Sequence, residues 1–259
     1  MIPKIIHYCW FGRNPLPPLA LECIASWKKF LPDYEIREWN EDNFDVNIIP
    51  YTAEAYRQKK FAFVSDYARF WILYKYGGLY FDTDVEVIRP MNDIIERGAF
   101  MGFETDPDGE NSPQKYPPRY AFGVNVGLGC GFEAGNDFVK DLLEKYEGLL
   151  FEDPRMSPML KTVVSHVTDA LVRRGLECKK GIQKIGNVTI YPHEYFAPIN
   201  VISGRLHITE KTRTIHRYMG SWNENRSWKY RIKILVPEWV FFALNKIKRK
   251  KFKYKQTLT

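Results

Sequence analysis

Residues 61–84 read FAFVSDYARFWILYKYGGLYFDTD, and this stretch decides the fold. Between residues 61 and 76 apolar side chains occupy nearly every face of a helical repeat, which is typical of a buried helix. The pair Gly77-Gly78 provides its C-terminal stop. Residues 79–81 then have the apolar and aromatic composition of a short buried strand. A buried helix that leads into a buried strand indicates an α/β domain.

The residues on either side favour the same class. Residues 5–10 form a nearly continuous apolar run that ends at Gly12, apolar residues recur at helical spacing over 21–31, and a second strand is expected over 34–39. This strand–helix–strand order builds parallel sheets. We therefore expect an α/β fold with a mostly parallel central sheet flanked by helices. Further strands are expected at 85–88, 100–103 and 122–128, and further helices at 137–150 and 160–173.

Two aspartates follow the expected strand. Asp82 and Asp84 stand two residues apart, and the alternation of side chains along a strand would place both carboxylates on one side. Such a pair suits a hard divalent cation, and open α/β sheets bind ligands beyond the carboxyl ends of their strands. We expect Asp84 to be an exposed ligand, so that Asp84→Ala would leave the fold intact. A bare D-x-D pair is nevertheless common by chance.

Asp66 and Arg69 make the aspartate pair more informative. They lie three residues apart on a helix that is otherwise apolar, where a charge is costly unless it is paired or used. Two interpretations remain open. The two residues are either a structural ion pair between helix and sheet, or groups that bind a ligand through charge-assisted hydrogen bonds.

The charge distribution argues against nucleic acid as a partner of the main body. The net charge is +7, but residues 229–255 hold ten basic residues against one acid, Glu238, so the rest of the chain is slightly acidic. Apolar and aromatic residues share this segment. We therefore expect a domain over 1–228, followed over 229–259 by a helical, basic and amphipathic extension that contacts an anionic membrane surface. A packed helix with a solvated basic end is the alternative.

The four cysteines show neither a CxxC pair nor zinc-finger spacing, which favours a reducing compartment. The N-terminus lacks the pattern of a secretory signal, and no apolar run approaches ~20 residues. We therefore expect a cytoplasmic protein that is either soluble or peripheral on the inner face of the cell membrane.

Four stretches in order carry a more specific signal. They are Ile2-Pro-Lys-Ile-Ile-His7-Tyr-Cys-Trp10-Phe-Gly12, then Ser26-Trp27 with Pro32-Asp-Tyr34-Glu and Trp39-Asn40, then residues 63–84, and His216-Arg-Tyr-Met-Gly-Ser-Trp222. Together they resemble the DxD-containing sugar-transferase family. That family includes bacterial capsule and lipooligosaccharide glycosyltransferases, yeast initiation-specific mannosyltransferases and, more distantly, the clostridial glucosylating toxins.

The resemblance implies a GT-A type nucleotide-sugar-binding fold, a Mn²⁺ or Mg²⁺ ion and a retaining transfer. By this resemblance Trp10 should lie against the nucleotide base, although a strand-end tryptophan is often a core residue. The implied catalytic residues are Asp66, Arg69, Asp82 and Asp84, of which Asp84 and Asp82 hold the metal. The implied nucleotide-sugar contacts are Trp10, Asp66, Arg69, Tyr80, Asp82 and a C-terminal loop with His216, Ser221 and Trp222.

We therefore expect a hexose or N-acetylhexosamine to move from a nucleotide sugar, with UDP favoured, to a saccharide acceptor. A lipid-linked acceptor in capsule, exopolysaccharide or lipooligosaccharide synthesis fits this expectation. The alternatives are a metal-dependent nucleotide-sugar hydrolase and a catalytically silent carbohydrate-binding module. One departure concerns the middle segment, where the family commonly carries a histidine and this chain has Glu133 after the glycines of 127–131. We interpret those glycines as sites of tight packing.

Overall fold

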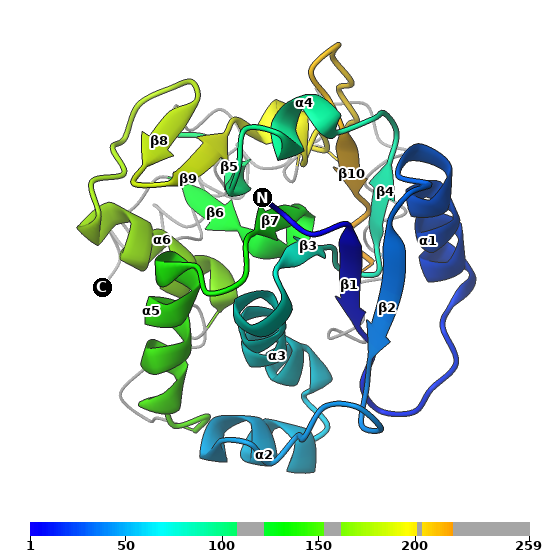
Figure 1. The fold of residues 1–259 in the computed structure, drawn as a ribbon, viewed down its shortest axis with the longest axis vertical. Helices are drawn as coiled ribbons and strands as arrows, with labels where there is room; N and C mark the ends of the chain where they lie inside the picture. The colour runs from blue at the N-terminus through cyan, green and yellow to red at the C-terminus, as the bar shows by residue number, and fades with distance from the viewer. Residues whose placement is uncertain (108–121, 153–161, 201–203, 220–259) are drawn as a thin grey trace, which may run out of the picture.

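The computed structural model describes residues 1–107, 122–152, 162–200 and 204–219. The expected extension over 229–259 lies outside the described residues, as do Ser221 and Trp222. Figure 1 shows α1 beside β4 on the right of the molecule, α3 near the centre, and α5 beside α3 on the left.

The described strands form one large mixed sheet in the order β2-β1-β3-β7-β5-β9-β8, with β6 paired to β5. Five of its eight strands (β1, β2, β3, β5 and β9) run in one direction, and the other three run against them, which confirms a mostly parallel sheet. The strands are β1 Ile5–Cys9, β2 Glu35–Trp39, β3 Gly78–Tyr80, β5 Phe100–Thr105, β6 Gly123–Asn125, β7 Cys130–Phe132, β8 Gln183–Ile185 and β9 Val188–Tyr191. A separate antiparallel pair joins β4 Val85–Val87 to β10 Thr214–His216.

Helices flank the sheet, as expected for α/β architecture. They are α1 Pro18–Phe30, α2 Pro50–Arg57, α3 Phe61–Tyr76, α4 Asn92–Ile95, α5 Asp137–Glu147 and α6 Val163–Arg173, with short 3₁₀ turns η1 Val126–Leu128 and η2 His193–Tyr195. The helix predicted over 61–76 is confirmed residue for residue. The strand predicted over 122–128 is only partly right, because it ends at Asn125, whose side chain accepts the Gly127 N–H and starts η1. No helix in the described part of the chain is long and apolar enough to cross a membrane.

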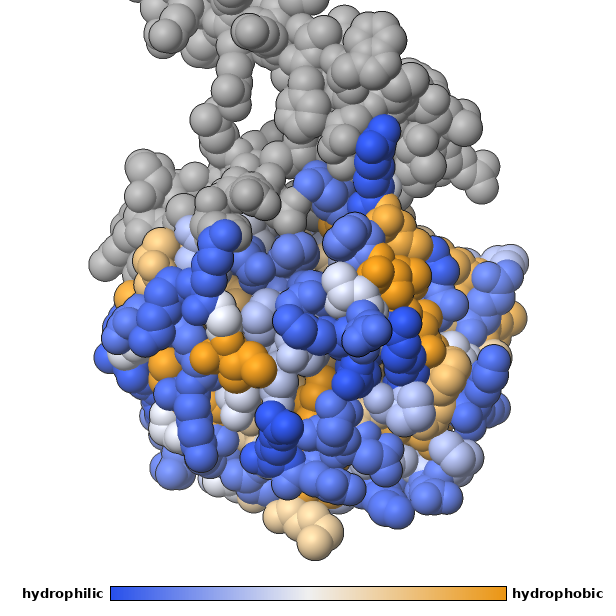
Figure 2. Space-filling view, turned by 90° about the horizontal axis from the view of Figure 1, so that it is seen from above, coloured by the Kyte–Doolittle hydropathy of each residue, from blue (hydrophilic) through white to orange (hydrophobic). Residues whose placement is uncertain are grey.

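The sheet separates two hydrophobic cores. Successive strand residues point to opposite faces, so Cys9 and Tyr80 pack in the core beneath α2, α3, α5 and α6, whereas Leu79 and Phe81 pack in the core beneath α1 and α4. The face seen in Figure 2 is largely hydrophilic, with apolar groups between the polar ones. The cysteines at 9, 23 and 130 are buried with free thiols, and Cys178 is exposed.

His7 fixes the centre of the sheet. Its Nδ1 accepts the indole N–H of Trp39 at 3.0 Å, so its Nε2 carries the proton and donates to the carbonyl of Gly77 at 2.9 Å. Burial lowers the pKa of His7 to about 4, and the ring is neutral. Gly77 and Gly78 both have positive φ, and a β-carbon at Gly78 would lie 2.6 Å from the carbonyl oxygen of Ile5. The histidine and the glycines together direct the chain from α3 into β3.

Candidate active site

Asp82 and Asp84 lie in the turn between β3 and β4. β3 ends at Tyr80, and the turn is closed by the Val85 N–H, which donates to the carbonyl of Asp82 at 3.0 Å. The expectation that strand alternation aligns the two carboxylates is therefore wrong. A turn brings them together, at the carboxyl end of a parallel strand as expected.

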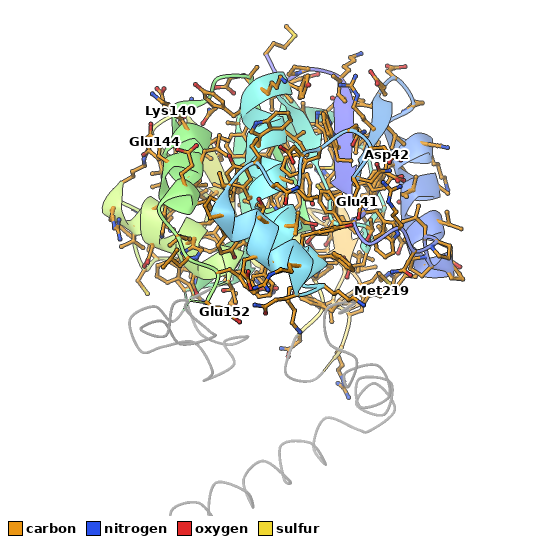
Figure 3. All side chains as sticks on the ribbon, turned by 90° about the horizontal axis from the view of Figure 1, so that it is seen from below. Glu41, Asp42, Lys140, Glu144, Glu152 and Met219 are labelled. Carbon is orange, nitrogen blue, oxygen red and sulfur yellow. The ribbon has the colours of Figure 1, made fainter. Side chains whose placement is uncertain are left out.

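His216 completes a cluster with the two aspartates. The pairing of β10 with β4 places His216 opposite Val85, and one ligand atom from each of Asp82, Asp84 and His216 lies within 4.8 Å of the others. Nε2 of His216 is 3.1 Å from Oδ1 of Asp84. The amide of Met219, labelled in Figure 3, donates to the other carboxylate oxygen of Asp84 at 2.7 Å.

The Asp84–His216 pair is buried and ionic. Each residue is only 8% exposed, so the expectation of an exposed Asp84 is wrong. Burial acts to lower the pKa of His216, but the charge of Asp84 and the hydrogen bond to it raise this pKa to about 9. Burial acts to raise the pKa of Asp84, yet the charge and hydrogen bond of His216 and the Met219 amide lower it overall. Removing one partner would leave a buried charge unpaired.

Arg69 lies between two carboxylates. Its Nη2 donates to Oδ1 of Asp66 at 3.0 Å, and its Nη1 is 3.3 Å from Oδ1 of Asp82. Asp66 and Arg69 therefore form an ion pair, and Arg69 joins α3 to the turn after β3, next to the metal-ligand candidates. Burial raises the pKa of Asp66 to about 7, against the opposing effect of the Arg69 charge.

Tyr80 contacts the Arg69 guanidinium, and Gly127 contacts the Asp82 carboxylate. The guanidinium of Arg69 lies 4.8 Å from the centre of the Tyr80 ring, which is 1% exposed. Gly127 has no side chain, and a β-carbon at this position would clash with the Asp82 carboxylate. Its carbonyl accepts the Asp82 N–H at 3.1 Å. The glycines of 127–131 are thus sites of tight packing, as interpreted from the sequence.

Trp10 directly follows β1. The preceding residue, Cys9, ends β1 and lies close enough to Arg69 and Asp82 for their charges to affect the pKa of its thiol. The indole N–H of Trp10 donates to the carbonyl of Asn14 at 2.6 Å, and the ring is partly exposed. Part of the ring packs on the core beneath α1, so the position combines a core contact with an accessible surface.

Sequence reasoning missed Glu104, and it missed that Gly127 packs against Asp82 in particular. Glu104 lies where the pairing of β5 with β6 shifts register, and a bulge of this kind redirects a side chain. Its carboxylate accepts the amide of Asn125 at 3.2 Å, and its charge contributes to the raised pKa of His216. No pattern in the sequence marks a bulge, but the glycine-rich segment could have been matched to the aspartate turn.

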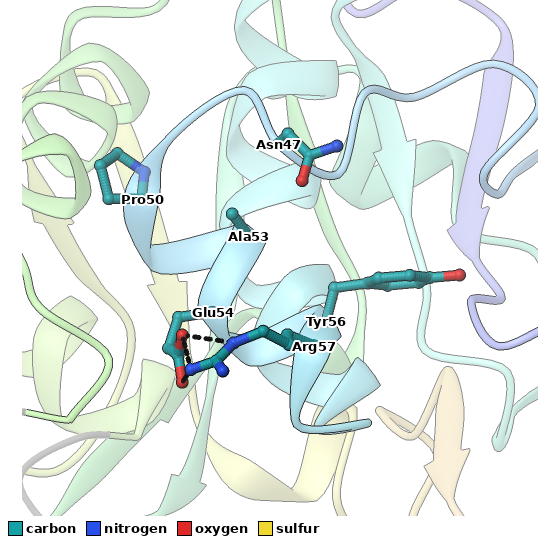
Figure 4. A pocket seen from close by; sticks show the side chains of 6 residues that line it. All are labelled: Asn47, Pro50, Ala53, Glu54, Tyr56 and Arg57. Atoms are coloured by element: carbon teal, nitrogen blue, oxygen red, sulfur yellow. Dashed lines mark hydrogen bonds and ion pairs between the residues drawn. The ribbon is translucent and has the colours of Figure 1, made fainter.

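A shallow hollow on α2 is a separate feature. Figure 4 shows its lining side chains, with Glu54 paired to Arg57. The lining residues are Asn47, Pro50, Ala53, Glu54, Tyr56 and Arg57. Since this lining contains none of the candidate site residues, we assign the site to the aspartate–histidine cluster.

The cluster suits Mn²⁺ or Mg²⁺. Ligand atoms that each lie about 2.1 Å from one ion are no more than about 4.2 Å apart. The three ligand atoms of this cluster lie within 4.8 Å of one another, which is close to that spacing. Carboxylates are preferred ligands of both ions, whereas an imidazole is a more usual ligand of softer divalent metals. Nδ1 of His216 is buried and makes no hydrogen bond among the described residues.

Comparison with known proteins bears directly on this region. Residues 17–101, which contain Asp66, Arg69, Asp82 and Asp84, match the family described as "Glycosyltransferase sugar-binding region containing DXD motif". This confirms the family resemblance. Trp10 and His216 lie outside the matched residues.

Two fungal relatives extend the comparison. Inositol phosphoceramide mannosyltransferase 3 of Schizosaccharomyces pombe is 32% identical over 112 residues, which are 42% of this chain and 31% of that protein. The initiation-specific alpha-1,6-mannosyltransferase of Candida albicans is 24% identical over 193 residues, or 66% of this chain and 44% of that protein. The chain thus spans less than half the length of these relatives.

Among solved structures, the PaToxG glycosyltransferase is similar at a TM-score of 0.47 and 18% identity. The likeness covers 66% of this chain and 69% of that one. It is a loose similarity of fold.

Proposed function

We propose that this protein is a metal-dependent glycosyltransferase that moves a hexose or N-acetylhexosamine from a UDP-sugar to a saccharide acceptor, with retention of configuration. The observation that carries the proposal is the meeting of Asp82, Asp84 and His216 beside the buried Asp66–Arg69 pair. Four of these five residues lie in the region that matches the sugar-transferase family.

Asp82, Asp84 and His216 would hold the divalent ion. A bound ion would supply Lewis-acid stabilisation of the negative charge on the departing nucleoside diphosphate. The protein's own contribution is to keep the ligands in place. Met219 holds one oxygen of Asp84 through its amide, and Gly127 leaves room for the Asp82 carboxylate.

Asp66 and Arg69 would hold the sugar. The Asp66 carboxylate can accept hydrogen bonds from sugar hydroxyls, and its ion pair with Arg69 orients it toward the Asp82 side of the site. Nη1 of Arg69 is buried, and it makes an ion pair with Asp82 but no hydrogen bond among the described residues. The Tyr80 ring keeps the guanidinium in place.

The name of one relative, an inositol phosphoceramide mannosyltransferase, supports a lipid-linked acceptor. A second relative is named as an alpha-1,6-mannosyltransferase, which supports mannose as the sugar. An acceptor presented at a membrane also fits the basic segment of 229–255. We propose that the chain acts on such an acceptor in capsule, exopolysaccharide or lipooligosaccharide synthesis, and we include mannose among the hexoses to test.

The test is nucleotide release from a panel of UDP-sugars and GDP-mannose, with Mn²⁺ and with chelator. We expect metal-dependent release from at least one donor, and faster release when a lipid-linked saccharide acceptor is added. Release that no acceptor accelerates would favour the hydrolase, and no binding or release with any donor would favour a silent binding module. The anomeric configuration of the first product, read by NMR, tests retention.

A further inference from the structure

The loop that follows β1, residues 10–14, has a demanding backbone conformation. Gly12 has φ +97° and Arg13 has φ +56°, so two successive residues lie in the left-handed region. Glycine adopts this region freely, whereas arginine does so at a cost in free energy. A side chain at Gly12 would also overlap the ring of Phe61. The loop therefore needs bonds from its neighbours to keep this shape.

Glu41, in the turn after β2, supplies those bonds. Its Oε1 accepts the backbone N–H of Gly12 at 2.6 Å and the hydroxyl of Tyr56 on α2 at 2.9 Å. One carboxylate oxygen thereby joins the loop after β1, the turn after β2 and α2. Figure 3 labels Glu41, and Figure 4 shows Tyr56 extending from α2.

The Glu41 carboxyl is charged at neutral pH. Partial burial acts to raise its pKa, but the hydrogen bonds from Gly12 and Tyr56 lower the pKa below its ordinary value. Both bonds are therefore charge-assisted, and bonds of this kind are stronger than those between neutral groups.

Trp10 is anchored to the same loop. Its backbone N–H donates to the carbonyl of Trp39 at 2.8 Å, and its indole N–H donates to the carbonyl of Asn14 at 2.6 Å. The position of the indole thus depends on the path of the chain between Trp10 and Asn14. Glu41 bonds to the middle of that path, at Gly12.

Asp42, the neighbour of Glu41, provides a natural contrast. Its carboxylate pairs with the Arg13 side chain at 2.7 Å, but the two side chains are 69% and 62% exposed. Asp42 therefore contacts the 10–14 loop only through an exposed ion pair, and such pairs contribute little to stability.

We propose that Glu41 is a positioning residue for the donor nucleotide: it holds the 10–14 loop in the conformation in which Trp10 stacks on the base. This inference rests on the proposed function, because it takes a nucleoside diphosphate as the ligand. A loop that is already ordered pays less conformational entropy when it binds a ligand. Glu41 therefore tightens nucleotide binding and leaves the chemical step at Asp82 and Asp84 unchanged.

The first test is calorimetric titration of UDP and of GDP, each with Mn²⁺, into the full-length protein. Glu41→Ala should weaken binding of the preferred nucleotide roughly 10-fold, as expected from the loss of charge-assisted bonds. The kcat at saturating donor should stay within about 2-fold, because the metal ligands are untouched. Glu41→Gln should restore most of the affinity, since its amide oxygen can accept the same two bonds. Asp42→Ala is the matched control and should bind like the wild type.

The second test asks whether Glu41 acts through Trp10. In a Trp10→Ala background, Glu41→Ala should cause no further loss of affinity, because the effects of coupled residues do not add. Equal losses in both backgrounds would overturn the inference, as would a fall in kcat with unchanged affinity. If Glu41→Ala does not fold, Tyr56→Phe removes one of the two bonds and should give a smaller loss in the same cycle. Wild-type protein that binds neither nucleotide overturns the proposed function itself, whereas binding that is insensitive to Glu41 overturns this inference alone.

Discussion

The carboxylate of Asp82 lies directly against the backbone of Gly127, so closely that a β-carbon at position 127 would overlap Oδ2 of Asp82. The same β-carbon would lie 3.2 Å from Nη1 of Arg69. Gly127 is therefore required by the space that the two charged groups occupy.

Gly127→Ala should displace Asp82 and weaken metal binding. Because ligand orientation is set by such neighbouring contacts, we expect a loss of about 10- to 100-fold in Mn²⁺ affinity and activity. The measurement is the Mn²⁺ dependence of nucleotide release. Gly148→Ala is the control, since a β-carbon there meets nothing closer than 3.7 Å. A Gly127→Ala protein with the Mn²⁺ dependence of the wild type would contradict the arrangement described here.

Asp84→Asn should abolish activity by orders of magnitude and keep the fold. The asparagine retains an oxygen for the Met219 amide but loses the charge that a divalent ion requires. Both variants remove the charge paired with the buried His216, but only Asp84→Ala also removes the acceptor of the Met219 amide. Asp84→Ala should therefore lower the free energy of unfolding more, by about 3 to 5 kcal/mol. Thermal unfolding compares the two variants. Full turnover of folded Asp84→Asn in excess chelator would end the metal hypothesis.

Asp66 should make folding stability depend on pH. Its folded pKa of about 7 exceeds the ordinary aspartate value of 3.8, so between these two pH values the folded state holds a proton that the unfolded state has lost. The contribution to stability is complete below about pH 4 and disappears as the pH rises through about 7, a change on the order of 4 kcal/mol. Asp66→Asn removes this dependence. Denaturant unfolding between pH 4.5 and 8 tests it, and parallel curves for the two proteins would show that Asp66 does not titrate in this window.

Trp10→Ala should weaken nucleotide binding by about 1 to 3 kcal/mol, the range for stacking of a base on an aromatic ring. The partly exposed ring at the end of β1 motivates this prediction. Titration of the free nucleotide with Mn²⁺ measures it. Unchanged affinity would mean that Trp10 is a core residue only.

The basic segment should hold the protein at an anionic membrane. Deletion of residues 229–259 should abolish binding to anionic vesicles and leave donor hydrolysis largely intact, because the implied catalytic residues all lie before it. Vesicle binding by the full chain should fall steeply as salt rises, since the Debye length is only about 8 Å at physiological ionic strength. Co-sedimentation at low and high salt tests this. A full chain that ignores anionic vesicles at low salt, or a deletion that unfolds, would identify the segment as a structural helix.

The sequence predicts the first half of the fold well, because its signals there are local. The helix over 61–76 has apolar residues on nearly every face and a glycine stop, and α3 has those bounds. β7 and β9 are only three and four residues long. They are strands because β7 pairs with β3 and β9 pairs with β5, and no local sequence pattern marks them. Helix α2 begins at Pro50 in a stretch that lacks a strong apolar face.

The candidate site, too, could be predicted from the sequence only where the signal is local. Asp66 and Arg69 are conspicuous because a charged pair interrupts an apolar helix, and they do form an ion pair. The contact of His216 with Asp84 depends on the pairing of β10 with β4, which neither segment encodes alone. The pairing of β10 with β4 also buries Asp84, which is why the sequence alone wrongly predicts that Asp84 is exposed.

The bond between the Met219 amide and Asp84 spans 135 positions of the chain. A nascent polypeptide that has been synthesised only through β9 would already contain every strand of the main sheet described here and both aspartates, yet it would lack the imidazole and the amide that complete the cluster. Synthesis of the sheet is therefore separated in time from completion of the candidate metal site. A prematurely terminated product would carry the main sheet and both aspartates without the third residue of that candidate site.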